Sequence, residues 1–199
     1  VIVPNPPGGG VNIMGRLIGQ RLAESWGQPA IVDNRPGANG FIGGNALAKS
    51  PPDGYTMMVM TSTHLITPLL LPAPYDPIKD FAPVATLAKS ELVLVAELAV
   101  PASNLQELIA LAKLKPGQFN RGSPGEGSPA RLVGSLFDMM TGTSMQNVSY
   151  KGVAQILVDL LGGQVQFTFA LPPAVMPHLS AGKLKAIAIS GETRFPALP

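Results

Sequence analysis

The chain of 199 residues contains no cysteine, and this absence excludes disulfide bonds, thiolate metal sites and thiol nucleophiles. Charged residues are also scarce, at 13% of the chain, and Lys and Arg (14) nearly balance Asp and Glu (12). Such a balance argues against nucleic-acid binding, which needs a basic face to displace counterions. The longest nearly apolar run, from Leu92 to Val100, is interrupted by Glu97 and is far shorter than the ~20 residues that cross a bilayer.

Sequence signatures of enzymes are missing as well. The chain has no G-x-G-x-x-G dinucleotide loop, no G-K-[ST] phosphate loop and no G-x-S-x-G nucleophile elbow. Its two histidines, His64 and His178, are far apart and have no carboxylate at metal-ligand spacing, so we interpret each as a surface or lobe-interface residue. We therefore expect no catalytic residue, no metal site and no cofactor.

Glycine (22 residues) and proline (21 residues) are abundant, and they divide the chain into short elements. In the first hundred residues a strand, a glycine-rich loop and a helix follow one another repeatedly. The apolar pattern predicts strands at 1–3, 30–32 and 55–60 and helices at 12–26 and 42–50. This alternation indicates an α/β unit with a parallel sheet.

The second half of the chain repeats the alternation and predicts a second α/β lobe. Ser103 and Gln106 resemble a capping box, which begins a helix that Pro116 ends. Ser128 is the expected N-cap of a helix whose first residue is Pro129. The remaining elements expected in this half are strands at 92–98, 165–169 and 184–189 and a helix at 153–161.

Two glycine-rich loops each lead into a predicted helix: the first glycine loop, residues 6–10, and the second glycine loop, residues 122–128. Free N–H groups at a helix N-terminus attract a carboxylate or a phosphate, and glycine lets the ligand approach the backbone. Ser123 and Ser128 add hydroxyl groups to the second loop. A purely steric role for the glycines is the alternative. One such loop in each lobe favours a grip on a dicarboxylate, or on a carboxylate with a polar tail.

Three consecutive hydroxyl side chains, Thr61, Ser62 and Thr63, follow the third predicted strand. In open α/β sheets, ligands bind outside the carboxyl ends of the strands. We therefore expect these hydroxyl groups to make polar contacts with a ligand.

A series of ordered sequence blocks resembles one known family. These blocks are Ile2–Gly10, Val32–Gly43, Pro52–Thr56, Tyr75–Val84, Gly122–Ser128, Tyr150–Gly152, Asp159–Val165 and Ala181–Leu184. In their order and spacing they resemble the Bug-type solute receptors of tripartite tricarboxylate transporters, and the resemblance covers essentially the whole chain.

The resemblance implies a fold of the α/β class, with the two lobes of a type II-like periplasmic binding protein. It also implies a longer parent chain, so we expect this sequence to be truncated at both ends and to lack its signal peptide. Residues 1–98 are expected to form the first lobe, 99–183 the second lobe, and 184–199 a crossover strand that returns toward the first lobe.

By the same resemblance, the expected function is that of an extracytoplasmic receptor in the periplasm. Such a receptor captures a small organic acid between its lobes and delivers it to the subunits of a tripartite tricarboxylate-type membrane transporter. The expected acid is a di- or tricarboxylate, an aromatic acid or an acidic amino acid. The resemblance implies no catalysis, no cofactor and no nucleic-acid partner, and we expect a monomer.

Backbone amides of the two glycine loops are expected to hold the ligand carboxylate. The expected ligand-binding residues are Pro7, Gly8, Gly9, Gly10, Asn12, Thr61, Ser62, Thr63, Ser123, Gly125, Gly127 and Ser128. Among the residues that depart from the family pattern, Asn12 stands where Asp is usual, Arg121 where an aromatic residue is expected, and Arg131 where His is usual. If these side chains face the ligand, they make the site less negative and favour an acid with a second acidic group. An Arg131 that faces solvent is the alternative.

Two other functions remain open from the sequence. A small α/β hydrolase needs a nucleophile and a base within reach of each other, and turnover of esters or phosphates would reveal it. The effector-binding domain of a transcription regulator can share the two-lobe architecture. A DNA-binding head ahead of residue 1 would support the regulator, whereas a signal peptide would support the receptor.

Overall fold

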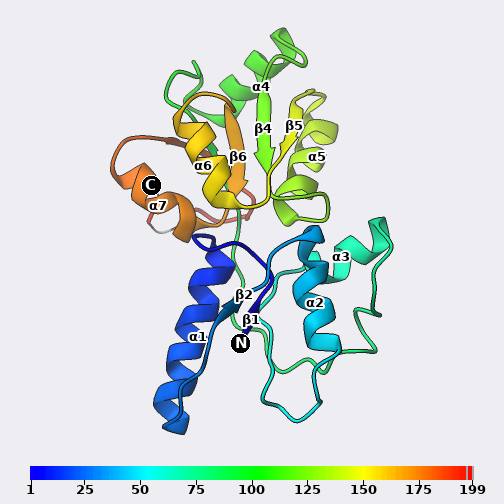
Figure 1. Ribbon diagram of the computed structural model, residues 1–199. Coiled ribbons are helices and arrows are strands. Elements are labelled where there is room, and N and C mark those ends of the chain that lie inside the picture. Colours follow the sequence, from blue (N-terminus) through cyan, green and yellow to red (C-terminus); the bar gives the residue numbers. More distant parts are fainter. Residues whose placement is uncertain (196, 199) are drawn as a thin grey trace. The chain divides into compact units, whose positions relative to one another are not determined.

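The computed structural model describes residues 1–195, 197 and 198, and their contacts form two compact units (Figure 1). Unit 1 comprises Val1–Leu87 together with Glu126–Ser128. Unit 2 comprises Ala88–Gly125 and the chain from Pro129 onward. Each unit combines helices with its own β-sheet, which agrees with the expected α/β class.

The division of the chain differs from the expected one in two places. The sequence predicts a boundary after residue 98, whereas the contacts place it between Leu87 and Ala88. The sequence also predicts that 184–199 returns toward the first lobe. In the structure, the strand at Lys185–Ile189 pairs with the strand at Val93–Ala96, and both belong to unit 2.

Unit 1 is built on a short parallel strand pair, in which β1 (Ile2–Val3) lies beside β2 (Asp33–Asn34). Met58 adds an isolated parallel bridge to Ile2. Helices α1 (Gly10–Trp26) and α2 (Phe41–Ala48) lie on opposite sides of the strand pair (Figure 1). The remaining helical segments of this unit are η1 (Ala38–Gly40), a 3₁₀ turn, and α3 (Thr63–Leu70).

The strands of unit 1 are shorter than the sequence predicts. β1 ends where Pro4 begins, because proline has no N–H to continue the ladder. The strand expected at 30–32 lies at Asp33–Asn34 instead, and the one expected at 55–60 is reduced to the bridge at Met58. β1 has only two residues available for pairing, so neither β2 nor the segment at Met58 forms a longer strand beside it.

Two glycines one turn apart allow α1 to lie directly against the strands. A Cβ atom on Gly15 would come within 2.5 Å of Val3 Cγ2, and one on Gly19 within 2.5 Å of Val32 Cγ2. The helix ends at Gly27, whose φ of 64° is the left-handed conformation of a glycine C-cap. This close packing holds α1 against the strand pair that the first glycine loop follows.

Unit 2 contains a five-stranded sheet with the strand order β5-β4-β6-β3-β7. The strands are β3 (Val93–Ala96), β4 (Asn120–Ser123), β5 (Gln146–Ser149), β6 (Phe167–Ala170) and β7 (Lys185–Ile189). β4 runs parallel to β5 and β6, whereas β3 runs antiparallel to β6 and β7. The parallel pairing predicted from the first hundred residues is therefore observed in unit 1, and unit 2 has a mixed sheet.

Helices cover both faces of the sheet in unit 2, and Figure 1 shows α6 lying across β4 and β6. On one face, α4 (Leu105–Leu114) and α5 (Pro129–Thr141) contribute to the apolar cluster of Leu94 and Phe167. On the other face, α6 (Val153–Leu161) and α7 (Pro172–Ser180) contribute to the cluster of Val93 and Val95. Adjacent residues of β3 belong to different clusters, because successive side chains of a strand point to opposite faces of the sheet. In the described part of the chain, no helix combines the length and the apolar character needed to cross a membrane.

The N-cap of α4 is one residue later than predicted. Oδ1 of Asn104 accepts a hydrogen bond from the N–H of Glu107 at 3.0 Å. Glu107 reaches back as in a capping box, but its Oε2 accepts from the N–H of Ser103, the residue before the N-cap, at 2.7 Å. The predicted pair of Ser103 and Gln106 is therefore wrong by one position, since the carboxylate of Glu107 makes the return contact.

Candidate functional site

In unit 1, the connections that leave the carboxyl ends of β1 and β2 run in opposite directions. The chain that leaves β1 enters α1 on one side of the strand pair, and the chain that leaves β2 enters α2 on the other side (Figure 1). In open α/β sheets, ligands bind where the connections reverse in this way. The first glycine loop follows β1 directly, so it lies at this switch point.

The first glycine loop presents backbone N–H groups. Helix α1 begins at Gly10, its N-cap residue Gly9 has no side chain to accept from the first turn, and that turn contains no acidic residue. A Cβ atom on Gly9 would meet no atom within 4 Å. Gly8 has a φ of 90°, which favours glycine. This geometry suits the predicted role of Pro7, Gly8, Gly9 and Gly10 in holding a carboxylate.

Asn12 takes part in a polar network that holds the start of this loop. The residue is 5% exposed, and its Nδ2 donates to Oδ1 of Asn34 at 3.0 Å. Nδ2 of Asn34 in turn donates to the backbone oxygen of Asn5 at 2.8 Å. Arg16 donates to Oδ1 of both Asn12 and Asn34 at 3.4 Å, so its guanidinium group turns back toward the N-terminus of α1. The structure thus gives Asn12 a supporting role and brings to the loop a cation that the sequence reasoning missed.

The three predicted hydroxyl residues lie where α3 begins, after the bridge at Met58. Oγ1 of Thr61 donates to Oγ1 of Thr63 at 2.9 Å, so these two hydroxyl groups pair with each other. Ser62 is exposed, and its side chain makes no capping bond to α3. Ser62 is therefore the residue of the three whose hydroxyl group is best placed for an outside partner.

Unit 2 has a similar switch point at the carboxyl end of β4. The chain that leaves β4 enters α5 on one face of the sheet, whereas the chains that leave β5 and β6 enter α6 and α7 on the opposite face. Since β4 lies between β5 and β6, the reversal falls at its last residue, Ser123. The sequence did not predict β4 as a strand, yet the second glycine loop begins where this strand ends.

Ser123 is a buried polar residue at this switch point. It has no exposed surface, and its Oγ has no hydrogen-bond partner within the described part of the chain. Its backbone oxygen accepts from the N–H groups of Gly125 and Tyr150, at 3.1 and 2.9 Å. A buried hydroxyl group without a partner is destabilising, so its presence at the end of a strand points to a ligand-binding role.

The remaining residues of the second glycine loop divide between the units. Gly125, with a φ of 91°, belongs to unit 2, whereas Gly127 and Ser128 belong to unit 1. A Cβ atom on Gly127 would lie 2.0 Å from Oγ1 of Thr67, so glycine is required there by the close approach of α3. Ser128 is buried and directly precedes Pro129, which is the first residue of α5, as predicted.

Arg121 lies inside unit 2. Its side chain is 2% exposed, and its Nη1 is 2.9 Å from Oδ2 of Asp138 on α5. The guanidinium group fills the space that Gly134 leaves open, since a Cβ atom there would be 2.3 Å from Arg121 Nε. The hypothesis that Arg121 makes a ligand site less negative is therefore wrong, because Asp138 compensates its charge within the unit. Arg131 lies in the first turn of α5 and is half-buried.

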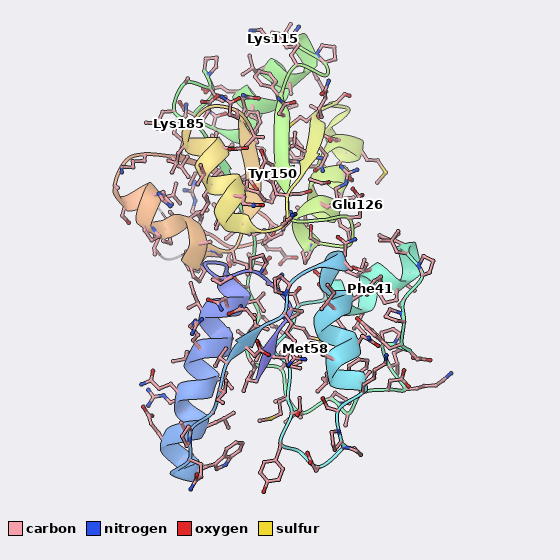
Figure 2. The ribbon with its side chains drawn as sticks, viewed as in Figure 1. Phe41, Met58, Lys115, Glu126, Tyr150 and Lys185 are labelled. Atoms are coloured by element: carbon pink, nitrogen blue, oxygen red, sulfur yellow. The ribbon has the colours of Figure 1, made fainter. Side chains whose placement is uncertain are left out.

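His64 is also buried, which excludes the first alternative of its interpretation as a surface or lobe-interface residue. Its ring stacks on Tyr75 with a centroid distance of 5.4 Å and meets the edge of Phe81 at 4.5 Å. Its Nε2 lies 3.2 Å from the backbone oxygen of Pro77. Burial lowers the pKa of His64. Phe41, labelled on α2 in Figure 2, meets the edge of Tyr75 at 5.9 Å, so the aromatic group ties the segment after α3 to α2.

The two histidines lie in different units of the chain. Among residues 1–195, 197 and 198, no three histidine or acidic side chains come together in a way that could hold a metal ion. His178 lies in the last turn of α7 in unit 2, whereas His64 belongs to unit 1. The switch points offer backbone N–H groups and hydroxyl groups instead, and these can bind a carboxylate without reacting with it.

Comparison with known proteins gives consistent matches over the chain. Residues 14–199 match the family described as "Tripartite tricarboxylate transporter family receptor". The chain is 40% identical over 205 residues to the protein BugT of Bordetella pertussis, covering 100% of this chain and 63% of BugT. It is similar to the solved structure of R. palustris Rpa4515 with adipate, at 36% identity and a TM-score of 0.96, covering 99% of this chain and 67% of that one. It is also similar to MatC from Rhodopseudomonas palustris with bound malate, at 30% identity and a TM-score of 0.90, covering 98% and 67%. The chain spans less than two thirds of the length of the curated relatives it matches.

Proposed function

The chain belongs to the tripartite tricarboxylate transporter family of receptors, and from this premise we propose that it serves as a periplasmic receptor for a small organic carboxylate. In this proposal the receptor binds its acid without catalysis and delivers it to a membrane transporter. Two of the solved structures that it resembles carry carboxylates, adipate in one and malate in the other, and this supports the proposed class of ligand.

The observation that carries the proposal is the position of the two glycine loops. The first loop begins at the switch point of unit 1 with its backbone open to an anion, and the second begins at Ser123, the switch point of unit 2. Backbone N–H groups at the start of α1 and the buried hydroxyl group of Ser123 are donors of the kind that a carboxylate accepts from. Each unit thus supplies such donors independently of the other.

We further propose that the acid carries two carboxylate groups. Adipate and malate, the ligands of the two similar structures, are both dicarboxylates. In unit 1 the Arg16 guanidinium donates to two neutral amide oxygens, those of Asn12 and Asn34. Because neither amide carries charge, neither offsets the positive charge of Arg16 beside the first glycine loop, and this charge favours a second acidic group.

Calorimetric titration of the parent protein, which contains this chain, tests the class of ligand. We expect a short dicarboxylate such as adipate or malate to bind, and the monoamide of the same acid to bind about tenfold more weakly or worse, because it lacks one charge. Aromatic acids and acidic amino acids, the other expected classes, belong in the same panel. Equal affinity for the diacid and its monoamide would contradict the preference for two acidic groups. Failure to bind any carboxylate would contradict the receptor function.

Two substitutions at Gly9 separate the backbone N–H from the shape of the loop. Gly9→Ala adds a methyl group where no atom lies within 4 Å, and the φ of −91° is open to alanine. Gly9→Pro keeps a similar φ but removes the N–H. We expect Gly9→Pro to weaken binding of the dicarboxylate about tenfold or more, because a charge-assisted hydrogen bond is lost. Gly9→Ala should change the affinity by less than about threefold.

Titration measures the affinities of the two Gly9 variants, and circular dichroism confirms that each variant is folded. If the proline variant binds as tightly as the alanine variant and the wild type, the N–H of Gly9 is not a ligand donor.

Delivery to a transporter and a periplasmic location rest on the family alone. Fractionation of cells that produce the parent protein tests the location, and uptake of a labelled dicarboxylate by cells that lack it tests delivery. We expect the protein in the periplasmic fraction and reduced uptake in its absence. A cytoplasmic protein and normal uptake would contradict both parts.

A further inference from the structure

A shallow surface pocket of about 380 Å³ in unit 2 is lined by Tyr150, Gln155, Val158 and Asp159. Tyr150, labelled in Figure 2, follows β5, and its Oη donates a hydrogen bond of 2.6 Å to Oδ2 of Asp159 on α6. Burial and this hydrogen bond raise the pKa of Tyr150 to about 12. The hydroxyl group therefore stays protonated, and remains a donor to Asp159, throughout the physiological pH range.

Tyr150 contacts the last two residues of β4. Its backbone N–H donates to the carbonyl oxygen of Ser123 at 2.9 Å. Its ring lies against Gly122, where an added Cβ atom would be 3.4 Å from Tyr150 Cε2 and 2.7 Å from Ile156 Cγ2. Tyr150 therefore contacts the end of β4 twice, through its backbone N–H and through its ring.

Asp159 is held in place independently of Tyr150. Its backbone oxygen accepts from the N–H groups of Gln164, at 2.8 Å, and Val165, at 3.4 Å, in the turn that leads from α6 to β6. The same helix contributes Ile156 and Leu160, which have no exposed surface, to the core of unit 2. Asp159 is thus a fixed point to which the hydroxyl group of Tyr150 is attached.

We propose that Tyr150 is a positioning residue that holds Ser123 in the orientation needed for ligand binding, and that Asp159 acts through Tyr150. The inference rests on the proposed function, because Ser123 is a candidate ligand contact. The hydroxyl group of Ser123 is buried without a partner among the described residues, so no hydrogen bond of its own holds it, and its position depends on the backbone at the end of β4. Ligand groups must be held to within about 0.5 Å, and neighbours that fix the backbone supply that precision.

Substitutions at the two ends of the hydrogen bond test the proposal by titration with the tightest-binding dicarboxylate of the panel. Tyr150→Phe keeps the ring against Gly122 and removes only the hydroxyl group. We expect Tyr150→Phe and Asp159→Ala each to weaken binding about tenfold, the equivalent of one hydrogen bond. The double variant should bind about as well as either single variant, since both remove the same link. Asp159→Asn, which still offers an oxygen to Tyr150, should restore most of the affinity.

Val158→Ala is the matched control. Val158 lines the same pocket on the same helix and is 70% exposed, so its truncation should leave the affinity unchanged. Hydrogen exchange of the ligand-free protein provides a readout that needs no ligand. We expect amides in the segment 122–125 to exchange several-fold faster in Tyr150→Phe than in the wild type, and to be unaffected by Val158→Ala.

Each outcome decides one point. Faster exchange together with weaker binding supports the proposal. Unchanged exchange in Tyr150→Phe overturns it, and so does faster exchange with unchanged affinity, since Tyr150 would then have only a structural role. If the wild type binds no carboxylate, the proposed function fails, and the proposal that Tyr150 positions Ser123 for a ligand fails with it. The exchange measurement then still shows whether Tyr150 orders the end of β4.

Discussion

His64 is enclosed by aromatic rings in unit 1, and its chemistry follows from that enclosure. Tyr75 stacks on one face of the imidazole and Phe81 meets it edge-on. Burial disfavours the charged form, so the pKa of His64 is lowered from its ordinary value of 6.5. The unfolded chain, in which the ring is solvated, binds a proton more readily than the folded one. The contribution of His64 to stability is therefore complete above about pH 6.5 and is lost as the pH falls toward the lowered pKa.

The lowered pKa of His64 predicts how the stability of unit 1 depends on pH. We expect the stability of unit 1 to decrease between about pH 7.5 and about pH 5.5, and the decrease to be smaller in His64→Phe, which keeps a ring but does not titrate. Urea unfolding at several pH values, followed by the fluorescence of Trp26, provides the measurement. Asp76 does not interfere, because backbone N–H groups of Lys79 and Ile78 hold its pKa below 3.8. Identical pH dependence in both proteins would show that His64 is not the titrating group.

Helix α5 illustrates how a buried charge constrains a whole element. Arg121 projects from β4 toward Asp138 on α5, and Gly134 on the same helix leaves the room that the guanidinium group occupies. Thr143, just beyond the helix, donates its hydroxyl hydrogen to the other oxygen of Asp138 at 3.0 Å. The glycine in mid-helix is thus explained by packing, since glycine itself weakens a helix interior.

The prediction at the scale of the element concerns Gly134→Ala. Alanine is favoured over glycine in a helix by about 1 kcal/mol, but the new methyl group would lie 2.3 Å from Arg121 Nε, and that side chain is almost fully buried. We expect the steric clash with Arg121 to outweigh the gain in helix propensity, so that the variant is destabilised by about 1–3 kcal/mol. Urea unfolding measures the difference. Ser135→Ala, at the exposed neighbouring position, is the control and should stay within about 0.5 kcal/mol of the wild type. A more stable Gly134→Ala variant would show that Arg121 can move aside.

The molecule as a whole consists of two units with unequal cores. In unit 2, Val95, Phe167 and Ile156 have no exposed surface and belong to clusters on both faces of a five-stranded sheet. In unit 1, the strand pair is two residues long, and Leu69 and Val84 are 83% and 86% exposed. Buried apolar area and sheet hydrogen bonds set the free energy of local opening, so the two units should open with different free energies.

The difference between the two cores predicts different rates of hydrogen exchange in the two units. Native-state hydrogen exchange should find the slowest amides in β3, β4 and β6, and amides of β1 and β2 should exchange at least about tenfold faster. Saturation with the bound dicarboxylate should slow exchange in the first glycine loop and in the segment after β4, if both hold the ligand. Uniform protection across both units would contradict the inequality of their cores.

Part of this structure follows from local sequence. The helix at Val153–Leu161 agrees with the prediction because its apolar side chains at three- and four-residue spacing form a buried face. The helix at Gly10–Trp26 also lies where it was predicted, but its buried residues are Asn12, Gly15 and Gly19, and Ile13 and Leu17 are nearly half exposed. Pro129 begins a helix as predicted, since its fixed φ and missing N–H suit that position. The strand β4, with the sequence Asn-Arg-Gly-Ser, has no such signal, and its existence depends on pairing with β5 and β6.

Local sequence accounts for the two glycine loops and the helices that follow them, because glycine and proline act through the backbone conformation of their own residues. The family of receptors could also be inferred from the order of these motifs. Long-range packing accounts for the pairing of Arg121 with Asp138, for the burial of His64, and for the position of Ser123 at the end of a strand. Each of these outcomes depends on contacts between residues well separated in the chain, and local sequence patterns carry no information about which distant segments will meet.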